Sequence, residues 1–440
     1  MDETTYESHV AILHDELVCA LGCTEPIAVA FAAAVARDVL GCEPERLEVR
    51  CSGNIIKNVK SVTVPNSGGL RGIEAAATLG AVGGDPHRAL EVLEAVDDAG
   101  RSRASELISA GYCDVALAED VPNLYVQVTA HAGDSWSRAT IAERHTNIVE
   151  LVRDGKACDP TPYLPKAHGT GEGDGPATPA TADARSCLSL SSIWEFAHTA
   201  RLADIEAPIR RQLELNEAIS DEGLAGDWGA NIGSTLLATR HDDVTCRARA
   251  RAAAGSDARM SGCALPVVII CGSGNQGITA SMPVLEYARE LGSLDEELVR
   301  AVALSDLTAV HAKSYIGELS AFCGAVTAAC GAGGAICMLR GGTFSDYEAT
   351  VVNTLANVGG IVCDGAKPSC AAKIAASVDA ALLGCDMALR ENSFRGGDGL
   401  VASDAEKTIR SMGYVGRVGM HPTDVEILNI MIGKTDVDAS

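Results

Sequence analysis

The segment from Cys323 to Cys370 constrains the chain most, because it sets five cysteines among glycines and alanines. Glycine lets a backbone approach a bulky ligand closely. Thiolates held in such a segment suit an iron–sulfur cluster or a zinc ion, and only weakly suit a disulfide. The C-x2-C-x2-C run of a ferredoxin and the paired C-x2-C of a zinc ribbon are both missing. Spacing alone therefore leaves a metal site and simple packing open.

Length and charge narrow the possible partners. The chain has 440 residues, enough for two domains, and its formal net charge of −24 disfavours nucleic acid and anionic membranes. Its apolar runs are too short to span a bilayer, and the start MDETTYESH is unlike a secretory signal. We expect a cytoplasmic protein with reduced cysteines and a small-molecule substrate. A homo-oligomer is compatible with these features.

Helical spacing of apolar residues predicts a helix over residues 6–22, ended by Gly22. A second helix is expected to open at Cys23-Thr24-Glu25-Pro26, with Thr24 or Glu25 as its cap. Cys23 would then face the positive end of that helix, where a thiolate is favoured.

Periodicity changes twice along the rest of the chain. Strands are expected at 47–51, 59–64, 115–117, 124–130 and 138–143, and helices at 69–79 and 86–96. From Ser189 onward the pattern is helical, interrupted by an apolar strand at 265–270 and by glycine-rich breaks.

We therefore predict an α+β fold with a mainly helical, Gly/Ala-rich catalytic domain from residues 1–42 and 189–440. A smaller α+β domain, residues 43–153, is inserted between these parts. Residues 154–188 are expected to form a flexible linker or insertion, because they are rich in Pro, Gly and Thr. Cys158 and His168 lie there, and an exposed loop is a better interpretation for them than metal ligands.

The sequence GSGNQG, from Gly272 to Gly277, matches the G-x-G-x-x-G pattern of a dinucleotide loop and follows an apolar run. Pro283 is expected to interrupt the following helix, and the acids at 295–297 lie in a helical stretch instead of at a strand end. A loop that binds a small carboxylate through backbone amides, Asn275 and Gln276 is the better interpretation.

Five motifs, in order, resemble the L-cysteine desulfidase family, which is related to the iron–sulfur L-serine dehydratase α chains. They are GCTEPIAVAFAA (22–33), SGNIIKNVKSVTVP (52–65), SGNQGITASMPV (273–284), HAKSYIGELSAFCG (311–324) and NVGGIVCDGAKPSC (357–370). The resemblance implies a [4Fe–4S] cluster held by Cys23, Cys323 and Cys363, with one iron left free for substrate. Cys370 is the reserve ligand, and Cys330 is expected to be packed.

The resemblance also implies the reaction, in which L-cysteine breaks down to pyruvate, ammonia and sulfide. The free iron would bind the substrate sulfur, and a base would remove the α-proton. Lys57, Lys313 and Glu25 are the candidate catalytic residues, either as the base or as charges that pair with the substrate. The candidate substrate-binding residues are Thr24, Asn54, Asn58, Asn275 and Gln276.

Two other functions stay open at this point. An L-serine dehydratase-like deaminase would use the same centre with water as the leaving group. A non-catalytic metal- or redox-sensing protein would carry a structural zinc or a fully ligated cluster, with Cys370 as the fourth ligand.

Overall fold

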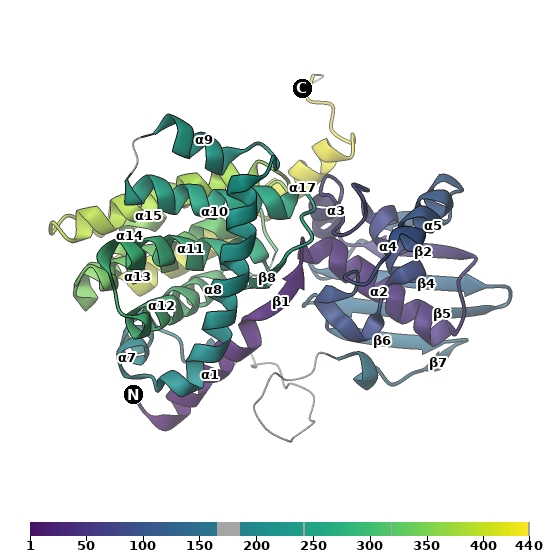
Figure 1. Ribbon diagram of the computed structural model, residues 1–440, viewed down its shortest axis with the longest axis horizontal. Coiled ribbons are helices and arrows are strands. Elements are labelled where there is room, and N and C mark those ends of the chain that lie inside the picture. Colours follow the sequence, from purple (N-terminus) through teal and green to yellow (C-terminus); the bar gives the residue numbers. More distant parts are fainter. Residues whose placement is uncertain (165–184, 241–242, 318, 439–440) are drawn as a thin grey trace.

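The computed structural model describes residues 1–164, 185–240, 243–317 and 319–438 (Figure 1). Figure 1 shows a helical lobe on the left and a smaller lobe, built on a sheet, on the right. The predicted fold class, mainly helical α+β, is confirmed. None of the described helices is long and apolar enough to cross a membrane.

The helical lobe contains most of the chain after residue 189 together with the first helix. Its helices are α1 (Glu3–Glu16), α7 (Leu190–Thr199), α8 (Leu202–Ala225), α9 (Ile232–Thr239), α10 (Val244–Met260), α11 (Gly274–Leu291), α12 (Asp295–Ser314), α13 (Gly324–Leu339), α14 (Phe344–Val358), α15 (Cys370–Ala388), α16 (Ala405–Tyr414) and α17 (His421–Met431), with the π-helical turn η3 (Val415–Gly419). Strands β1 (Val18–Leu21) and β8 (Pro266–Ile269) form a separate antiparallel pair.

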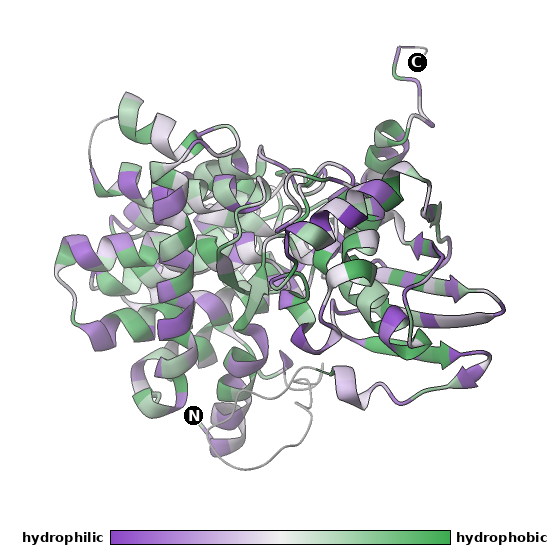
Figure 2. Cartoon of the chain, turned by 45° about the vertical axis from the view of Figure 1, so that its right-hand side comes forward, coloured by the Kyte–Doolittle hydropathy of each residue, from purple (hydrophilic) through white to green (hydrophobic). Residues whose placement is uncertain are grey.

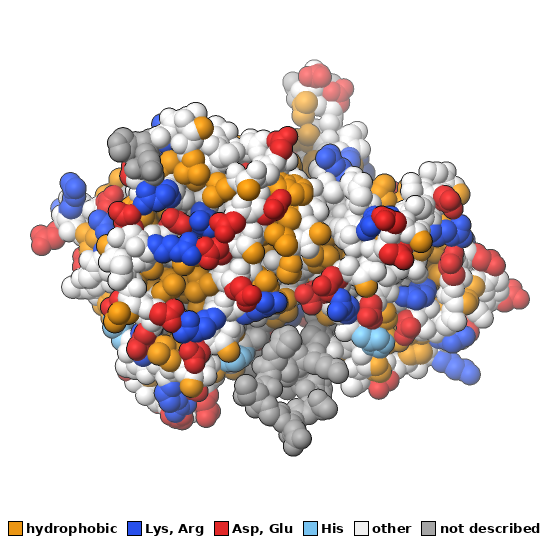
Figure 3. Space-filling model, in the orientation of Figure 1, with side chains coloured by type: hydrophobic (Ala, Val, Ile, Leu, Met, Phe, Trp, Pro, Cys, Tyr) orange, Lys and Arg blue, Asp and Glu red, His pale blue; other side chains and the backbone are white. Residues whose placement is uncertain are grey.

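Small residues make the core of this lobe compact. Helix α13 is the central element: it packs on α11, α12, α14 and α15. Residues 325–337 of this helix are all buried, and most of them are Ala, Gly or Cys. Short side chains let helix backbones approach closely, so the Gly/Ala-rich sequence is explained by packing. Elsewhere the helices carry hydrophobic and hydrophilic segments (Figure 2), and acidic and basic side chains mix on the face in Figure 3.

The smaller lobe is a six-stranded sheet covered by helices. Its elements are α2 (Thr24–Leu40), β2 (Arg46–Cys51), α3 (Gly53–Val59), α4 (Ile73–Gly83), η1 (Pro86–Glu91), α5 (Asp98–Ser109), β3 (Cys113–Leu117), β4 (Tyr125–Ala132), β5 (Ser135–Ala142), β6 (Ile148–Arg153), β7 (Lys156–Ala157) and η2 (Thr161–Tyr163). The strand order is β3-β2-β4-β5-β6-β7, and only the β2–β3 pair is parallel.

Helix α2 is the apolar helix expected after Cys23, and it packs on α4, β4 and β5. It is buried over nearly its whole length, which explains a sequence that is apolar on every side. Its N-cap is Cys23, whereas Thr24 or Glu25 was expected to cap it. The division into residues 1–42 plus 189–440 and 43–153 stays a prediction, and α2 itself contacts the sheet.

Three predicted elements are wrong. The helix expected over 6–22 ends at Glu16, and the next residues form β1, because pairing with β8 competes with helical periodicity. The strand expected at 59–64 is instead the end of α3 and a turn. Ser52 is the N-cap of α3, because its side chain accepts a hydrogen bond from the Ile55 N–H group. Pro283 does not interrupt α11, where packing compensates for the missing N–H donor.

Most other predicted elements are present, with bounds that differ by a few residues. Strands at 47–51, 115–117, 124–130, 138–143 and 265–270 are confirmed within a few residues, whereas β6 was not predicted. The segment 86–96 begins as the 3₁₀ helix η1 instead of an α-helix. Within 154–188, β7 and η2 are ordered parts of the smaller lobe, and Cys158 is half-buried. His168 lies outside the described residues.

Candidate functional site

The site begins where the β1–β8 pair meets the smaller lobe. Leu21 at the end of β1 pairs with Pro266 at the start of β8. The next residue, Gly22, has a φ of +60° and packs against Pro65, a conformation that suits glycine. This turn places Cys23, 1% exposed, at the N-terminus of α2.

The GSGNQG loop folds back on β8 to reach the same place. Helix α11 starts at Gly274, and an added Cβ at Gly277 would overlap the carbonyl oxygen of Val268. Glycine is therefore required for helix–strand packing. The Thr24 hydroxyl donates to the carbonyl oxygen of Gly272 at 2.8 Å, which fastens this loop to the start of α2.

Glu25 is the polar centre of this region. Its carboxylate accepts hydrogen bonds from Cys23 Sγ at 3.0 Å, Thr24 Oγ1 at 3.2 Å and Asn58 Nδ2 at 3.2 Å. Burial acts to raise the pKa of Glu25, but the nearby His145, Cys23 and Arg259 outweigh it, so the pKa lies below its ordinary value. The group is therefore a half-buried carboxylate whose charged form is favoured.

Arg259 and His145 complete this cluster. Arg259 Nε donates to the carbonyl oxygen of Gly22 at 2.8 Å, and Nη1 donates to Asn275 Oδ1 at 3.1 Å. His145 is 7% exposed; burial lowers its pKa, and the nearby Glu25 carboxylate opposes that shift. His145 Nε2 and Arg259 Nη2 are both buried without a hydrogen-bond partner among the described residues.

Cys323 and Cys363 lie side by side on two paired backbone segments. Cys323 N donates to Ile361 O at 3.0 Å, and Cys363 N donates to Ala321 O at 2.6 Å. Cys323 is the N-cap of α13, and Cys370 is the first residue of α15. Burial, reinforced by the neighbouring Cys363 and Cys370 thiols, raises the pKa of Cys323 to about 12.

Cys23 lies beside this second group. It packs with Val62 and Met260, and Ala366 and Cys370 lie against that small cluster. Gln276 of the GSGNQG loop packs against Gly324, the residue after Cys323. Its Oε1 accepts a hydrogen bond from Thr327 Oγ1 at 3.4 Å. The tertiary structure thus gathers cysteines from chain segments separated by about three hundred residues in sequence.

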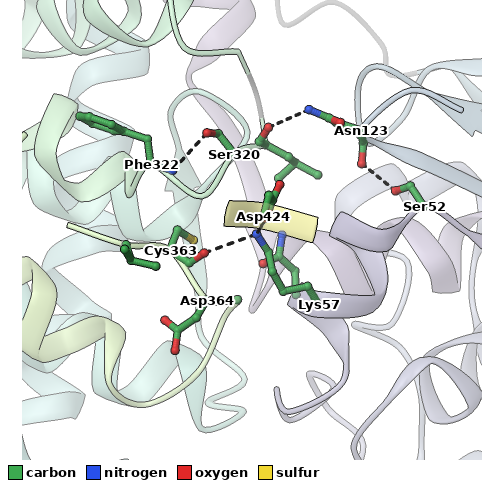
Figure 4. Close-up of polar contacts among 12 residues, drawn as sticks. Ser52, Lys57, Asn123, Ser320, Phe322, Cys363, Asp364 and Asp424 are labelled. Carbon is green, nitrogen blue, oxygen red and sulfur yellow. Dashed lines mark hydrogen bonds and ion pairs between the residues drawn. The ribbon is translucent and has the colours of Figure 1, made fainter. Parts of the chain in front are cut away.

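Lys57 connects the two lobes at the same place (Figure 4). Its Nζ forms a buried ion pair with Asp424 of α17 and donates to the carbonyl oxygen of Cys363 at 3.4 Å. Nearby, Asn123 Nδ2 donates to Leu319 O at 3.0 Å across the lobes. A small cavity of about 30 Å³, room for about one water, adjoins Asp424.

The remaining predicted residues lie at the margin of the site. The Asn54 side chain, in the first turn of α3, has a buried Oδ1 with no partner among the described residues. Lys313 is buried near the end of α12, and its charge acts on the Cys271 thiol.

Residues 87–429 match a known family, the serine dehydratase alpha chain. The chain belongs to this family. The matched region includes two of the predicted cysteine ligands, Cys323 and Cys363, and both Arg259 and Asp424. Cys23 and Lys57 lie before the matched region.

UPF0597 proteins of other organisms match this chain over nearly its full length. UPF0597 protein DSY1109 of Desulfitobacterium hafniense is 48% identical over 429 residues, covering 98% of this chain and 97% of its own. UPF0597 proteins of Lachnoclostridium phytofermentans and Finegoldia magna are 45% and 44% identical, each covering 97% of this chain and 100% of their own.

The donor chemistry of the site, a set of thiols, is compatible with an iron–sulfur cluster. Among residues 1–164, 185–240, 243–317 and 319–438, no three His, Cys, Asp or Glu side chains are grouped to hold one metal ion. Cys23, Cys323, Cys363 and Cys370 are all thiols, and three of them begin helices, where N–H groups favour thiolates.

Three residues of this site carried no usable signal in the sequence. Arg259 ends an alanine-rich helix, His145 follows a strand in a short turn, and Asp424 lies in the C-terminal helix. A lone arginine among small residues is a weak sign of a buried charge. The partner that makes each of them informative lies far away along the chain.

Proposed function

We propose that the protein is an L-cysteine desulfidase, a carbon–sulfur lyase that releases pyruvate, ammonia and sulfide. The observation that carries the proposal is the pairing of Cys323 with Cys363 next to Cys23 and the charged Glu25. Membership in the serine dehydratase alpha chain family supports lyase chemistry at this site. The motifs shared with L-cysteine desulfidases favour cysteine as the substrate.

A [4Fe–4S] cluster is proposed as the cofactor, with Cys23, Cys323 and Cys363 as its ligands. When bound, a cluster with one iron free of protein ligands supplies a Lewis acid for the leaving group. The protein shields this site from water, since Cys23 is only 1% exposed and Cys323 only 9% exposed. Deprotonated thiolates in such a setting require a compensating cation, since burial raises the pKa of both groups.

The other residues bind and orient the amino acid. Glu25 is charged and lies beside Cys23, so it suits the substrate ammonium. Asn58 holds one carboxylate oxygen of Glu25 through a 3.2 Å hydrogen bond and thereby fixes its orientation. Lys57 pairs with Asp424 and donates to the carbonyl oxygen of Cys363, which suits anchoring of the Cys363 loop better than proton abstraction.

The proposal is tested by anaerobic reconstitution followed by measurement of bound iron and sulfide. Pyruvate release from L-cysteine and L-serine is then measured side by side, and L-cysteine is added while the visible spectrum is recorded. We expect pyruvate and sulfide from L-cysteine and a change in the spectrum. A loaded protein whose spectrum ignores both amino acids, and which releases no pyruvate, would instead be a non-catalytic sensor.

L-Serine deamination is the second candidate function, because the matched family is named for serine dehydratase. The same residues would hold the amino acid, and only the leaving group differs. Turnover of L-serine without turnover of L-cysteine would establish this alternative and remove the desulfidase proposal.

A further inference from the structure

Arg259 carries a buried positive charge that its hydrogen bonds do not neutralise. The residue is 2% exposed, and it takes part in none of the ion pairs that the described side chains form with one another. Its two acceptors, the carbonyl oxygen of Gly22 and the amide oxygen of Asn275, are both neutral. Because the guanidinium forms no direct ion pair with a carboxylate among the described residues, it is able to pair with an incoming anion.

The two hydrogen bonds fix the plane of the guanidinium. Nε is held by Gly22, at the start of the Cys23 turn, and Nη1 is held by Asn275, at the start of α11. The third nitrogen, Nη2, is buried and has no partner among the described residues. Arginine presents its donors in a rigid fork that matches a carboxylate, so Nη2 is a prepared donor.

Glu25 provides the opposite charge on the same turn. Its carboxylate takes hydrogen bonds from Cys23, Thr24 and Asn58. Arg259 Nε donates to the carbonyl oxygen of Gly22, the residue before Cys23, and Glu25 accepts from the Cys23 thiol, so both charges lie close to Cys23. A positive and a negative group beside one thiol match the two charges of an α-amino acid.

We propose that Arg259 binds the α-carboxylate of the substrate through Nη2 while Glu25 faces the α-ammonium group. The site thereby selects zwitterionic α-amino acids over amines and amides. This inference rests on the proposed function, since it places the amino acid beside Cys23. It also assigns Asn275 a positioning role toward Arg259 instead of direct contact with the substrate.

The packing of Gly274 against the guanidinium supports the role proposed for Arg259. A Cβ added at Gly274 would collide with Arg259 Nε and with Val267. The glycine at this position of GSGNQG thus makes room for an arginine side chain, where a nucleotide loop would make room for a phosphate. Gly274→Ala should displace the guanidinium without removing its charge.

The test compares L-alanine with L-alaninamide, which differ in the carboxylate and lack a leaving group. Binding to the reconstituted full-length protein is measured from the shift of the unfolding midpoint with ligand concentration, so turnover is not needed. We expect the wild type to prefer L-alanine by on the order of 100-fold, as for a buried charge-assisted pair. Arg259→Gln should abolish this preference by weakening L-alanine binding alone.

Arg249→Gln is the matched control, because Arg249 lies on the same helix and pairs with Asp379 at 3.0 Å near the surface. It should keep the wild-type preference. Gly274→Ala should lower the preference, and it decides the question together with the wild type if Arg259→Gln does not fold. A wild type that binds both compounds equally, or an Arg259→Gln protein that keeps the preference, overturns the inference.

Failure of the inference and failure of the proposed function give different results. If L-cysteine and L-serine release no pyruvate but the preference for L-alanine depends on Arg259, the carboxylate site stands in a protein of another activity. If pyruvate is released and no carboxylate preference exists, the function stands and the assignment of Arg259 is wrong.

Discussion

Lys57 and Asp424 form a buried ion pair, although 367 residues of sequence separate them. Lys57 belongs to α3 of the smaller lobe, and Asp424 belongs to α17 at the end of the chain. The same Nζ donates to the carbonyl oxygen of Cys363 (Figure 4). The pair therefore connects both lobes to the loop that carries a proposed cluster ligand.

Removing one partner of this pair should be strongly destabilising. Asp424→Ala leaves the Lys57 charge buried without compensation, and we expect a loss of about 3–5 kcal/mol of stability. The double variant Lys57→Met/Asp424→Leu should recover most of that loss, as measured by urea unfolding. Lys407→Met, which breaks an exposed ion pair with Asp404, should cost less than about 1 kcal/mol. Equal losses from Asp424→Ala and Lys407→Met would show that the pair is not buried in solution.

Substitution of the proposed ligands should remove the cluster selectively. Cys23→Ser, Cys323→Ser and Cys363→Ser should each lose most of the iron and sulfide bound after anaerobic reconstitution, because serine is a poor ligand for iron–sulfur centres.

Cys330→Ala is the matched control for the ligand series. Cys330 lies inside α13, whose N-cap is Cys323, and it is fully buried. Its loss should therefore leave the iron content unchanged. Cys370→Ser decides the role of the fourth cysteine. Retention of iron by this variant supports three ligands, whereas loss of iron would make Cys370 a ligand.

Asp306 should make stability depend on pH. The residue is fully buried in α12, and burial raises the pKa of its carboxyl to about 8, above the ordinary value of 3.8. The folded state therefore holds a proton that the unfolded state releases. The contribution of this proton to the free energy of unfolding is complete below about pH 4 and is lost as the pH rises through 8. Between these values the free energy of unfolding should fall by up to about 1.4 kcal/mol per pH unit.

Asp306→Asn stays neutral and can still accept the 3.0 Å hydrogen bond from Gln212 Nε2. Its stability advantage over the wild type should grow between pH 5 and 8, as measured by urea midpoints. Asp379→Asn, at a half-exposed carboxylate that pairs with Arg249, is the matched surface control. A constant difference between Asp306→Asn and the wild type across this range would contradict a neutral Asp306.

Gly277 should tolerate no side chain. In Gly277→Ala the new methyl group would overlap the carbonyl oxygen of Val268, so α11 must move away from β8. We expect a loss of about 1–3 kcal/mol, typical of an overpacked core. The shift should also displace Asn275 and Gln276. Gly360→Ala is the control, since nothing lies within 4 Å of a Cβ there. Equal thermal midpoints for the two variants would contradict close packing at Gly277.

Local sequence determined the type of most elements. Apolar spacing and the all-apolar α2 sequence are properties of short segments, so α2, the sheet strands and the helices after Ser189 could be predicted. Errors occurred where a distant partner competes with local preference. Val18–Leu21 is helical by periodicity and becomes a strand because β8 offers it hydrogen bonds.

The candidate site divides in the same way. The resemblance to L-cysteine desulfidases singled out Cys23, Cys323 and Cys363, and the motifs that carry it contain Glu25 and Asn58. Tertiary structure decided which of them meet: Cys323 with Cys363 through paired backbones, and Glu25 with Asn58 through a hydrogen bond. Only the tertiary structure shows that Arg259, His145 and Asp424 belong to the candidate site. Burial and charge pairing depend on atoms brought from remote parts of the chain, and sequence spacing does not contain those distances.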